Sequence, residues 1–369
     1  MGPSDQSLVE LFSDLPDPRS NQGKRHLLED LLTITVLAVL SGCDDWKSIE
    51  DYAHDEEAFL RTFLRLPHGP PSDDTFRRLF SRLDTRSFSK VFMKWTSRLA
   101  QICVNDVIAV DGKTVRRSFQ EADPKSAIHL VSAWSNANHM VLGQLKVEGK
   151  SNEIKAIPEL LEMLCIAGNI VTIDAMGCQT GIAKQIVEGG ADYILAVKDN
   201  QKSLLEEMES LFKVLPIDSH DEQIEGDHGR IEIRQAKVIH DLRLLDEKVR
   251  WKGIRSIIQI ESTRQIRSQV TTETRLYISS LKVDAKVANQ AIRMHWGVEN
   301  SLHWVLDIAF REDECRKRIG NQPENFAIVR KFALNLLKQD RSLRLGVKNR
   351  RIKAARNREY LLGLLMYRE

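Results

Sequence analysis

Three short apolar segments place the strongest limit on how this chain can fold. They are VIAV (107–110), NIVTI (169–173) and ADYILAV (191–197). Helical periodicity is found in AIPELLEMLCIAG, which precedes the second segment, and in CQTGIAKQIVEGG, which separates the second from the third. AIHLVSAWS and HMVLGQLKV flank NAN, which is typical of a β-hairpin. A hairpin followed by alternating helices and strands predicts an α/β fold, a mixed sheet covered by helices.

The regions on either side of this core have other patterns. Residues 1–103 predict an all-helical N-terminal domain, with one helix ending at Gly42, one in DWKSIEDYAHDEEAFLRTFL, and one capped by Ser72 or Asp73 after a proline pair. Arg77 and Arg78 lie early in that last helix. This position is typical of a helix that reads a DNA groove, but it fits a basic surface helix equally well. We expect the α/β region to span 104–338 with a polar, strand-containing insertion at about 200–285, and 339–369 to form a basic tail.

A formal net charge of +2 conceals strong segregation of charge along the chain. Residues 1–60 have a net charge of −9, residues 61–100 of +6 and residues 316–369 of +11, which leaves −6 for the middle. The segment KNRRIKAARNR has six basic residues and no acid, among them Lys348, Arg350 and Arg351. Basic ends around an acidic middle indicate a polyanion partner and carboxylates available for metal ions.

Two classes of protein are excluded by simple patterns. The longest charge-free apolar run, LLTITVLAVLSGC, is shorter than the roughly 20 residues that cross a bilayer, and the N-terminus has no basic signal region. The five cysteines show no paired spacing, which argues against a disulfide framework or a zinc knuckle. We therefore expect a cytoplasmic protein with no membrane partner.

Two acids follow apolar strands, where side chains leave the core. Asp111 and Asp174 occupy these places, and acids at adjacent strand ends repel one another unless a cation or a proton lies between them. Carboxylate oxygens suit Mg²⁺ or Mn²⁺. With Glu299 from a packed helix, the set could hold two ions about 3.5–4 Å apart, as in phosphoryl transfer.

Glu299 lies in HWGVENSLHWVLD, where His295, Glu299, His303 and Asp307 recur every four residues along one predicted helix face. We expect Met294, Val298, Leu302, Val305 and Ile308 on the opposite, apolar face, and Trp296 and Trp304 packed against the sheet. A zinc site on the two histidines and Glu299 is an alternative, but they span roughly 12 Å of helix. A P-loop at GKT (112–114) is excluded because Val107 replaces the required glycine.

Several longer motifs together resemble one family. VIAVDGKTVRRS, AIHLVSAWS, KSNEIKAIPELLEML, VTIDAMGCQ, YILAVKDNQ, HGRIEIR, LYISS and HWGVENSLHWVLDIAFREDECR are similar, in this order, to the H-repeat-associated insertion-sequence transposases. The resemblance implies an RNase H-like core with an Asp–Asp–Glu triad, a β-rich insertion before the glutamate and a helical N-terminal region. By motif, the triad is Asp111, Asp174 and Glu299, the three acids selected above.

The chain departs from the wider superfamily around the glutamate. A Tyr and an Arg often precede it and a Lys follows, but Ile292, His295 and Leu306 occupy those positions here. Other groups must then hold the DNA phosphates. The candidates are Lys113, Lys198, Arg230, Arg234 and His295, with Arg77, Arg78, Lys348, Arg350 and Arg351 from the basic segments.

The expected function is Mg²⁺-dependent hydrolysis of phosphodiesters at the ends of an insertion sequence, followed by strand transfer into target DNA. The partners would be double-stranded DNA and further copies of the chain, in the bacterial cytosol at the nucleoid. Two alternatives stay open. One is a catalytically silent DNA-binding relative, and the other is a metal-dependent nuclease that does not join strands.

Overall fold

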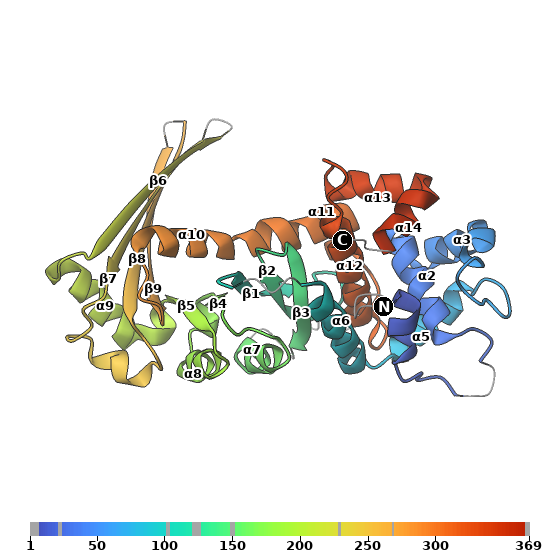
Figure 1. Ribbon diagram of the computed structural model, residues 1–369, viewed down its shortest axis with the longest axis horizontal. Coiled ribbons are helices and arrows are strands. Elements are labelled where there is room, and N and C mark those ends of the chain that lie inside the picture. Colours follow the sequence, from blue (N-terminus) through green and yellow to red (C-terminus); the bar gives the residue numbers. More distant parts are fainter. Residues whose placement is uncertain are drawn as a thin grey trace.

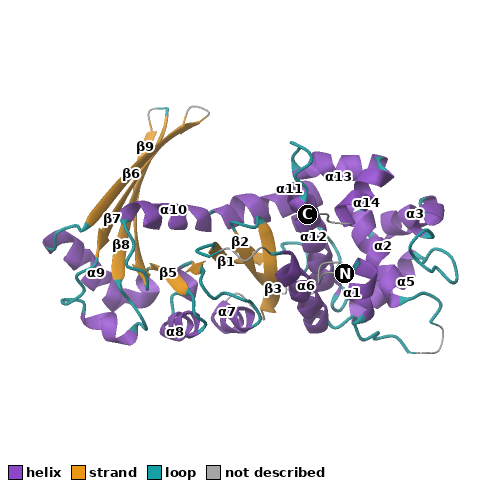
Figure 2. Cartoon of the chain, in the orientation of Figure 1, coloured by secondary structure: helices purple, strands orange, loops and turns teal. Residues whose placement is uncertain are grey.

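The computed structural model describes most of the chain, namely residues 7–20, 24–100, 104–119, 127–147, 152–227, 230–267 and 269–365. Figure 1 shows an elongated molecule with a bundle of helices at one end, a long ribbon of strands at the other, and a mixed sheet between them. Figure 2 shows the same division by type of structure. The candidate acids belong to the middle part.

The central sheet is the predicted mixed sheet. Its first five strands are β1 (Val107–Thr114), β2 (His129–Ser135), β3 (Met140–Val147), β4 (Ile170–Ile173) and β5 (Asp192–Val197). They lie in the order β3-β2-β1-β4-β5. The pairs β1–β2 and β2–β3 are antiparallel, whereas β4 and β5 run parallel to β1. This is the RNase H-like core, and the fold prediction is confirmed.

Residues between β5 and α10 extend this sheet into a long ribbon (Figure 1). They form α9 (Lys202–Val214), β6 (Ser219–Asp227), β7 (Arg230–Ile239), β8 (Ser256–Ile266) and β9 (Gln269–Ser279). The strands continue the sheet in the order β5-β9-β8-β7-β6, and each pairs with its neighbour in antiparallel fashion. The first six residues of β9 are exposed and its last four are buried, so the ribbon is anchored at one end and reaches away from the core at the other.

Helices cover both faces of the central sheet. On one side lie α7 (Glu153–Glu162) and α8 (Thr180–Glu188), which contact β2, β3 and β5. On the other side α10 (Ala285–His295) crosses β1 and β4, as Figure 1 shows. Because α10 leads directly toward Glu299, its crossing of β1 and β4 brings the third acid to the strands that carry the first two.

The N-terminal region is helical, as predicted. Its helices are α1 (Leu8–Ser13), α2 (Leu28–Leu40), α3 (Trp46–Asp55), α4 (Glu57–Leu60), α5 (Asp73–Arg82) and α6 (Thr85–Leu99). The chain turns after α2 at Gly42, whose φ of +98° is a conformation that glycine tolerates best. Ser72 occupies the N-cap position of α5, but its side chain makes no capping hydrogen bond. The single helix expected from Trp46 onward is instead interrupted at Glu56.

The C-terminal region is folded onto this helical part and is not an extended tail. It contains α12 (Gln322–Gln339), α13 (Val347–Arg356) and α14 (Arg358–Leu365). Almost every residue of α12 is buried, and the ring of Phe332 contacts aromatic rings of α1 and α6. On the other side α12 contacts β3. The helical part and the central sheet therefore share one hydrophobic core through α12.

Two smaller observations complete the fold. Cys43, Cys165, Cys178 and Cys315 are free thiols, and Cys103 lies outside the described residues. Within the described chain, none of the helices has the length and apolarity needed to cross a membrane.

Candidate active site

Asp111 and Asp174 are brought side by side by the pairing of two strands. The parallel pairing of β1 with β4 ends at Val110 and Ile173, which are register partners, and each acid is the next residue of its strand. Asp174 directly follows β4 and caps a short 3₁₀ turn. Its Oδ1 accepts hydrogen bonds from the backbone N–H groups of Met176 and Gly177. The two acids lie side by side, as expected, because each directly follows the last paired residue of its strand.

Asp111 does not end its strand, in contrast to the prediction. It pairs with Ser132 of β2, and this antiparallel pairing continues for three further residues to Thr114. The difference arises because β1 has two neighbours of unequal length: β4 stops at the acid and β2 does not. The backbone of Asp111 is therefore still paired with β2 although its parallel neighbour β4 has ended beside it, and its side chain lines the cavity described below.

Glu299 begins a π-helical turn, Glu299–His303, that lies between α10 and α11 (Trp304–Phe310). A π turn inserts residues into a helix and rotates the faces that follow it, and such turns often occur at functional sites. The observed apolar face differs from the predicted one. Val298, Leu302 and Leu306 are buried, whereas Met294 and Ile308 of the expected stripe are exposed.

All three acids line one cavity of about 160 Å³. Its basic lining residues include Lys198, after β5, and Arg275 of β9. The predicted set of acids thus converges on one space from three separate parts of the chain. Arg275 was not predicted, because nothing in the sequence indicates that the base of the insertion reaches the acids.

Burial and negative charge make the cavity unfavourable for ionised carboxylates. Burial raises the pKa of Asp111 to about 7, and the charges of Asp174 and Glu299 add to the increase. Burial also raises the pKa of Asp174, to which the nearby charge of Glu153 contributes, while Lys198 acts in the opposite direction. Positive charge placed between these acids would relieve this cost.

Glu153 is a fourth acid beneath the cavity, and sequence reasoning missed it. It is buried in the first turn of α7, and its Oε1 is hydrogen-bonded to Nε2 of His129. The other ring nitrogen of His129 lies 2.9 Å from Oγ1 of Thr114. A Cβ atom on Gly112 would lie 2.6 Å from both Glu153 Oε1 and His129 Nε2, so only glycine fits after Asp111. The motif containing Glu153 was noticed, but its helical position gave no sign of this contact.

His303 and Lys113 form a second group on the other side of Asp111. His303 Nδ1 lies 3.4 Å from Asp111 Oδ2. The Lys113 ammonium pairs with Asp307 and, at 3.0 Å, with Glu312. Burial lowers the pKa of His303 to about 3, and the positive charge of Lys113 assists, so the imidazole is neutral.

The donor set suits a hard divalent cation. Three carboxylates face one small cavity, and two of them have raised pKa values, which a bound cation would bring down. Among the described residues, no three His, Cys, Asp or Glu side chains are arranged as a ready cluster around one point. Mg²⁺ does not need such a cluster, since it commonly takes one or two carboxylates and fills its other positions with water and phosphate oxygens. The zinc alternative does need one and gains no support.

The predicted DNA-contacting residues fall into two groups. Exposed or partly exposed ones are Arg77, Arg78, Lys198, Arg230 and Lys348. Of these, only Lys198 lines the cavity of the acids. Arg77 and Arg78 form ion pairs with acids at the start of α5, and Arg230 lies on β7 in the ribbon.

The second group is committed to internal contacts, and we remove it from the candidate DNA-binding set. Lys113 is paired as described above, and Arg234 is only 5% exposed. Arg350 donates to the backbone carbonyls of Leu337, Asp340 and Leu343. Arg351 donates to those of Val39 and Ala309 and to the Asp44 carboxylate. The basic segment that suggested DNA binding therefore serves in part to attach α13 to the core.

His295 and the two tryptophans also differ from expectation. The His295 ring is buried, which lowers its pKa to about 4, and its Nδ1 lies 3.0 Å from Thr172 Oγ1. It is neutral and cannot supply the charge of the missing arginine. Trp296 lines the cavity, with the Arg275 guanidinium 4.5 Å above its ring. Trp304 is 61% exposed and is not packed against the sheet.

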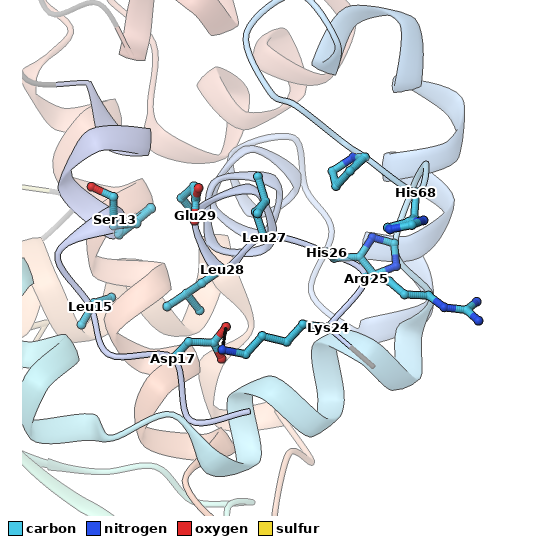
Figure 3. Close-up of a pocket in the computed structure, with 12 residues that line it drawn as sticks. Ser13, Leu15, Asp17, Lys24, Arg25, His26, Leu27, Leu28, Glu29 and His68 are labelled. Carbon is cyan, nitrogen blue, oxygen red and sulfur yellow. Dashed lines mark ion pairs between the residues drawn. The ribbon is translucent and has the colours of Figure 1, made fainter. Parts of the chain in front are cut away.

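A separate hollow in the N-terminal region does not share this chemistry (Figure 3). It measures about 390 Å³, lies beside α1 and the start of α2, and is lined by Asp17, Lys24 and His26 among others. The Asp17 carboxylate is already paired with Lys24 at 3.2 Å and with Arg19 at 2.8 Å. None of the three acids of the candidate site lines it.

Fold and site together define a nucleic-acid-processing enzyme class with an RNase H-like core and an Asp–Asp–Glu set. A family model described as "Transposase DDE domain" matches residues 103–336, and one described as "DDE_Tnp_1-associated" matches residues 9–96. This chain belongs to the DDE transposase family.

Relatives over the whole length agree with this assignment. The chain is 43% identical to "Putative transposase YncI" of Escherichia coli O157:H7, over 98% of this chain and 94% of that protein. It is 39% identical to "H repeat-associated putative transposase YhhI" of Escherichia coli strain K12, over 98% of each. A shorter match, 35% identical over 21% of this chain and 92% of that protein, is named "Inactive transposase YbfQ", from the same strain.

Proposed function

We propose that this protein cuts and joins DNA as the transposase of an insertion sequence. Asp111, Asp174 and Glu299 would hold two Mg²⁺ or Mn²⁺ ions. When bound, the ions supply positive charge to the attacking and leaving oxygens of a phosphodiester. The observation that carries the proposal is the convergence of the three acids on one cavity from β1, the end of β4 and the turn after α10.

The chemistry would proceed in two balanced steps. In the first, a water oxygen attacks the phosphorus at the element end, the bond from phosphorus to the 3′-oxygen breaks, and a 3′-hydroxyl and a 5′-phosphate result. In the second, that 3′-hydroxyl attacks a phosphodiester of target DNA and displaces a 3′-oxygen there. No bond between protein and DNA is needed in either step, so the protein acts by positioning and by charge.

Residues around the acids suit the positioning role. Lys198 and Arg275 are the cations that line the cavity, and they would hold non-bridging oxygens of the reacting phosphate. Arg275 comes from the base of the insertion and takes the place of the arginine that many relatives carry before the glutamate. Glu153 and His129 would hold the backbone around Gly112, and His303 would orient the Asp111 carboxylate.

The partner would be double-stranded DNA, contacted by exposed basic residues such as Arg78, Arg230 and Lys348. Because two element ends must be processed together, we propose that the chain works as a homo-oligomer. The site of action would be the bacterial nucleoid.

The test is cleavage of a supercoiled plasmid that carries the gene with its native flanking DNA. We expect strand cleavage at the element ends in Mg²⁺, none in EDTA, and none with Asp111→Asn, Asp174→Asn or Glu299→Gln. Joined products would separate a transposase from a nuclease that only cuts. Binding without any cutting by the wild-type protein would favour the silent relative, a possibility kept open by the related protein named as inactive.

A further inference from the structure

A second charged cavity lies outside the candidate active site. It measures about 670 Å³ and is formed where α3 and α5 of the helical region meet α12 and the segment after α11. We call it the junction cavity. Its basic lining residues are Arg77, Arg311, Arg316, Lys317, Arg318 and Arg330. Its acidic ones are Asp44, Asp45 and Glu314, so the lining has an excess of positive charge.

Arg330 is the residue that most needs a partner here. It extends from the middle of α12, is 1% exposed, and within the described part of the chain none of its three guanidinium nitrogens has a well-aligned hydrogen-bond partner. Among the described residues its ion-pair contact is with Glu312, at 3.9 Å, its guanidinium lies 4.6 Å from the centre of the Phe326 ring, and, against the effect of burial, the nearby Cys315 thiol raises its pKa. A buried charge that is neither hydrogen-bonded nor closely paired is costly, so an anion in the cavity would be bound favourably.

Most of the other cations are already engaged. Lys317 donates to the backbone carbonyl of Asp44 and lies over the rings of Trp46 and Phe326. The Arg311 guanidinium is hydrogen-bonded to the Glu314 carboxylate. These contacts hold the wall of the cavity in place and leave its charge facing inward.

The remaining lining cations are less constrained. Arg77 pairs with acids of its own helix, and Arg318 donates to the backbone carbonyl of Arg117. Arg316 is exposed and forms no ion pair with a described residue. Arg330, which is buried, and Arg316, which is exposed, are therefore the lining cations with the weakest pairing among the described residues.

We propose that the junction cavity binds a backbone phosphate of DNA at a point distinct from the reacting phosphate. A guanidinium can pair with two phosphate oxygens at once, and Arg330 and Arg316 both line this cavity. The inference rests on the proposed function, because it takes the anion to be part of the DNA substrate. The site would fix the orientation of the duplex and would carry no sequence information.

The cavity is connected to the catalytic strand by one carboxylate. Glu312 contacts Arg330 on one side and accepts from the Lys113 ammonium on the other, at 3.0 Å. Lys113 is two residues from Asp111 on β1. A phosphate held in the junction cavity would therefore be fixed relative to the acids by a short series of contacts inside one core.

The test measures DNA affinity against salt concentration, with a fluorescent duplex of about 30 base pairs, unrelated sequence and no metal. Each lost phosphate contact lowers the slope of log affinity against log salt by about one. We expect that decrease for Arg316→Ala, which leaves the core intact, and for Arg330→Gln. The matched control is Lys184→Ala, an exposed lysine on α8 away from both cavities. Wild-type slopes for Arg316→Ala and for any folded Arg330→Gln would overturn the proposal.

A second arm identifies the source of the anion. Inorganic phosphate is added at millimolar concentration and thermal stability is measured for the wild type and Arg316→Ala. Stabilisation that is lost in the variant, together with unchanged DNA slopes, would assign the cavity to a free phosphate and contradict the DNA proposal. Cleavage is assayed separately, so a protein that binds DNA through the cavity but does not cut fails only the proposed function.

Discussion

The imidazole of His303 faces the carboxylate of Asp111, with Nδ1 lying 3.4 Å from Oδ2. The ring is neutral because burial and neighbouring positive charges lower its pKa to about 3. Its Nε2 has no hydrogen-bond partner among the described residues. A neutral imidazole can turn an N–H toward a carboxylate and fix its direction without competing for a cation, which is the role of groups that support metal ligands.

His303→Ala should therefore reduce metal-dependent cleavage by roughly 10- to 100-fold, the usual effect of removing such a supporting contact. His303→Asn keeps a donor at a similar distance and should restore part of the activity. The measurement is cleavage rate against Mn²⁺ concentration, where we expect the alanine variant to need more Mn²⁺. If both variants cut at the wild-type rate at every Mn²⁺ concentration, His303 has no part in positioning Asp111.

The stability of the metal-free protein should depend on pH through Asp111. Its pKa rises from 3.8 when unfolded to about 7 when folded, so the folded state binds the proton more tightly. The stability that Asp111 contributes as a neutral acid is present below pH 4 and is lost as pH rises toward 7. Asp111→Asn removes this dependence, because the amide stays neutral.

We therefore expect wild type and Asp111→Asn to be similar in stability at pH 4, and the variant to be the more stable at pH 8, by on the order of 1–3 kcal/mol. Urea unfolding in EDTA at both pH values measures this. Mg²⁺ should narrow the difference at pH 8 by stabilising the wild type only. If the variant is less stable than the wild type at pH 8 without metal, the ionised Asp111 carboxylate does not destabilise the folded protein, and this explanation is wrong.

Gly112 should be intolerant of a side chain. A methyl group there would meet Glu153 and His129 at 2.6 Å, both of them buried and held by each other. Gly112→Ala should lower the free energy of unfolding by about 1–3 kcal/mol and displace Asp111, so cleavage should fall as well. The control is Gly181→Ala on α8, where no atom lies within 4 Å and a helix favours alanine. Denaturant unfolding of the pair measures the difference, and equal stabilities would show that the space around Gly112 is not closed.

Arg275 should affect catalysis more than DNA binding. It lines the cavity of the acids, and its guanidinium is held over Trp296 and by the Glu273 carboxylate. Arg275→Ala should lower the cleavage rate by roughly 100-fold, as expected when a donor to a reacting group is lost. The affinity for a long duplex should change little, because that affinity is spread over many contacts. The control is Arg243→Ala, an exposed arginine paired with Asp241 in the insertion. An Arg275→Ala variant that cuts as fast as this control would exclude Arg275 from the site.

The sequence was sufficient to predict the two strands and that an acid follows the apolar run of each. Val107–Val110 and Ile170–Ile173 are apolar runs followed by acids, and the pairing of parallel strands then determines that Asp111 and Asp174 meet. The hairpin of β2 and β3 followed from its turn residues in the same way. These features depend on local pattern and on rules of sheet pairing that hold for many proteins.

Other features depend on contacts between distant residues, which local pattern does not contain. The π turn at Glu299 rotates the helix that follows it, so the predicted burial of Ile308 and Trp304 was wrong. Met294, which precedes the turn, is exposed as well. Arg351 looked like part of a basic surface but binds backbone carbonyls of α2 and α11. Its burial could be known only once α13 was placed against those helices.

The central claim is that Asp111, Asp174 and Glu299 act together as one metal-dependent site for cutting DNA. Its most direct test is the cleavage of supercoiled plasmid containing the gene and its flanking DNA by four proteins, the wild type and the Asp111→Asn, Asp174→Asn and Glu299→Gln variants, each with Mg²⁺ and with EDTA. The account predicts cleavage only by the wild type with Mg²⁺, and DNA binding by all four. Cleavage by any of the three variants at the wild-type rate, or by the wild type in EDTA, would contradict it.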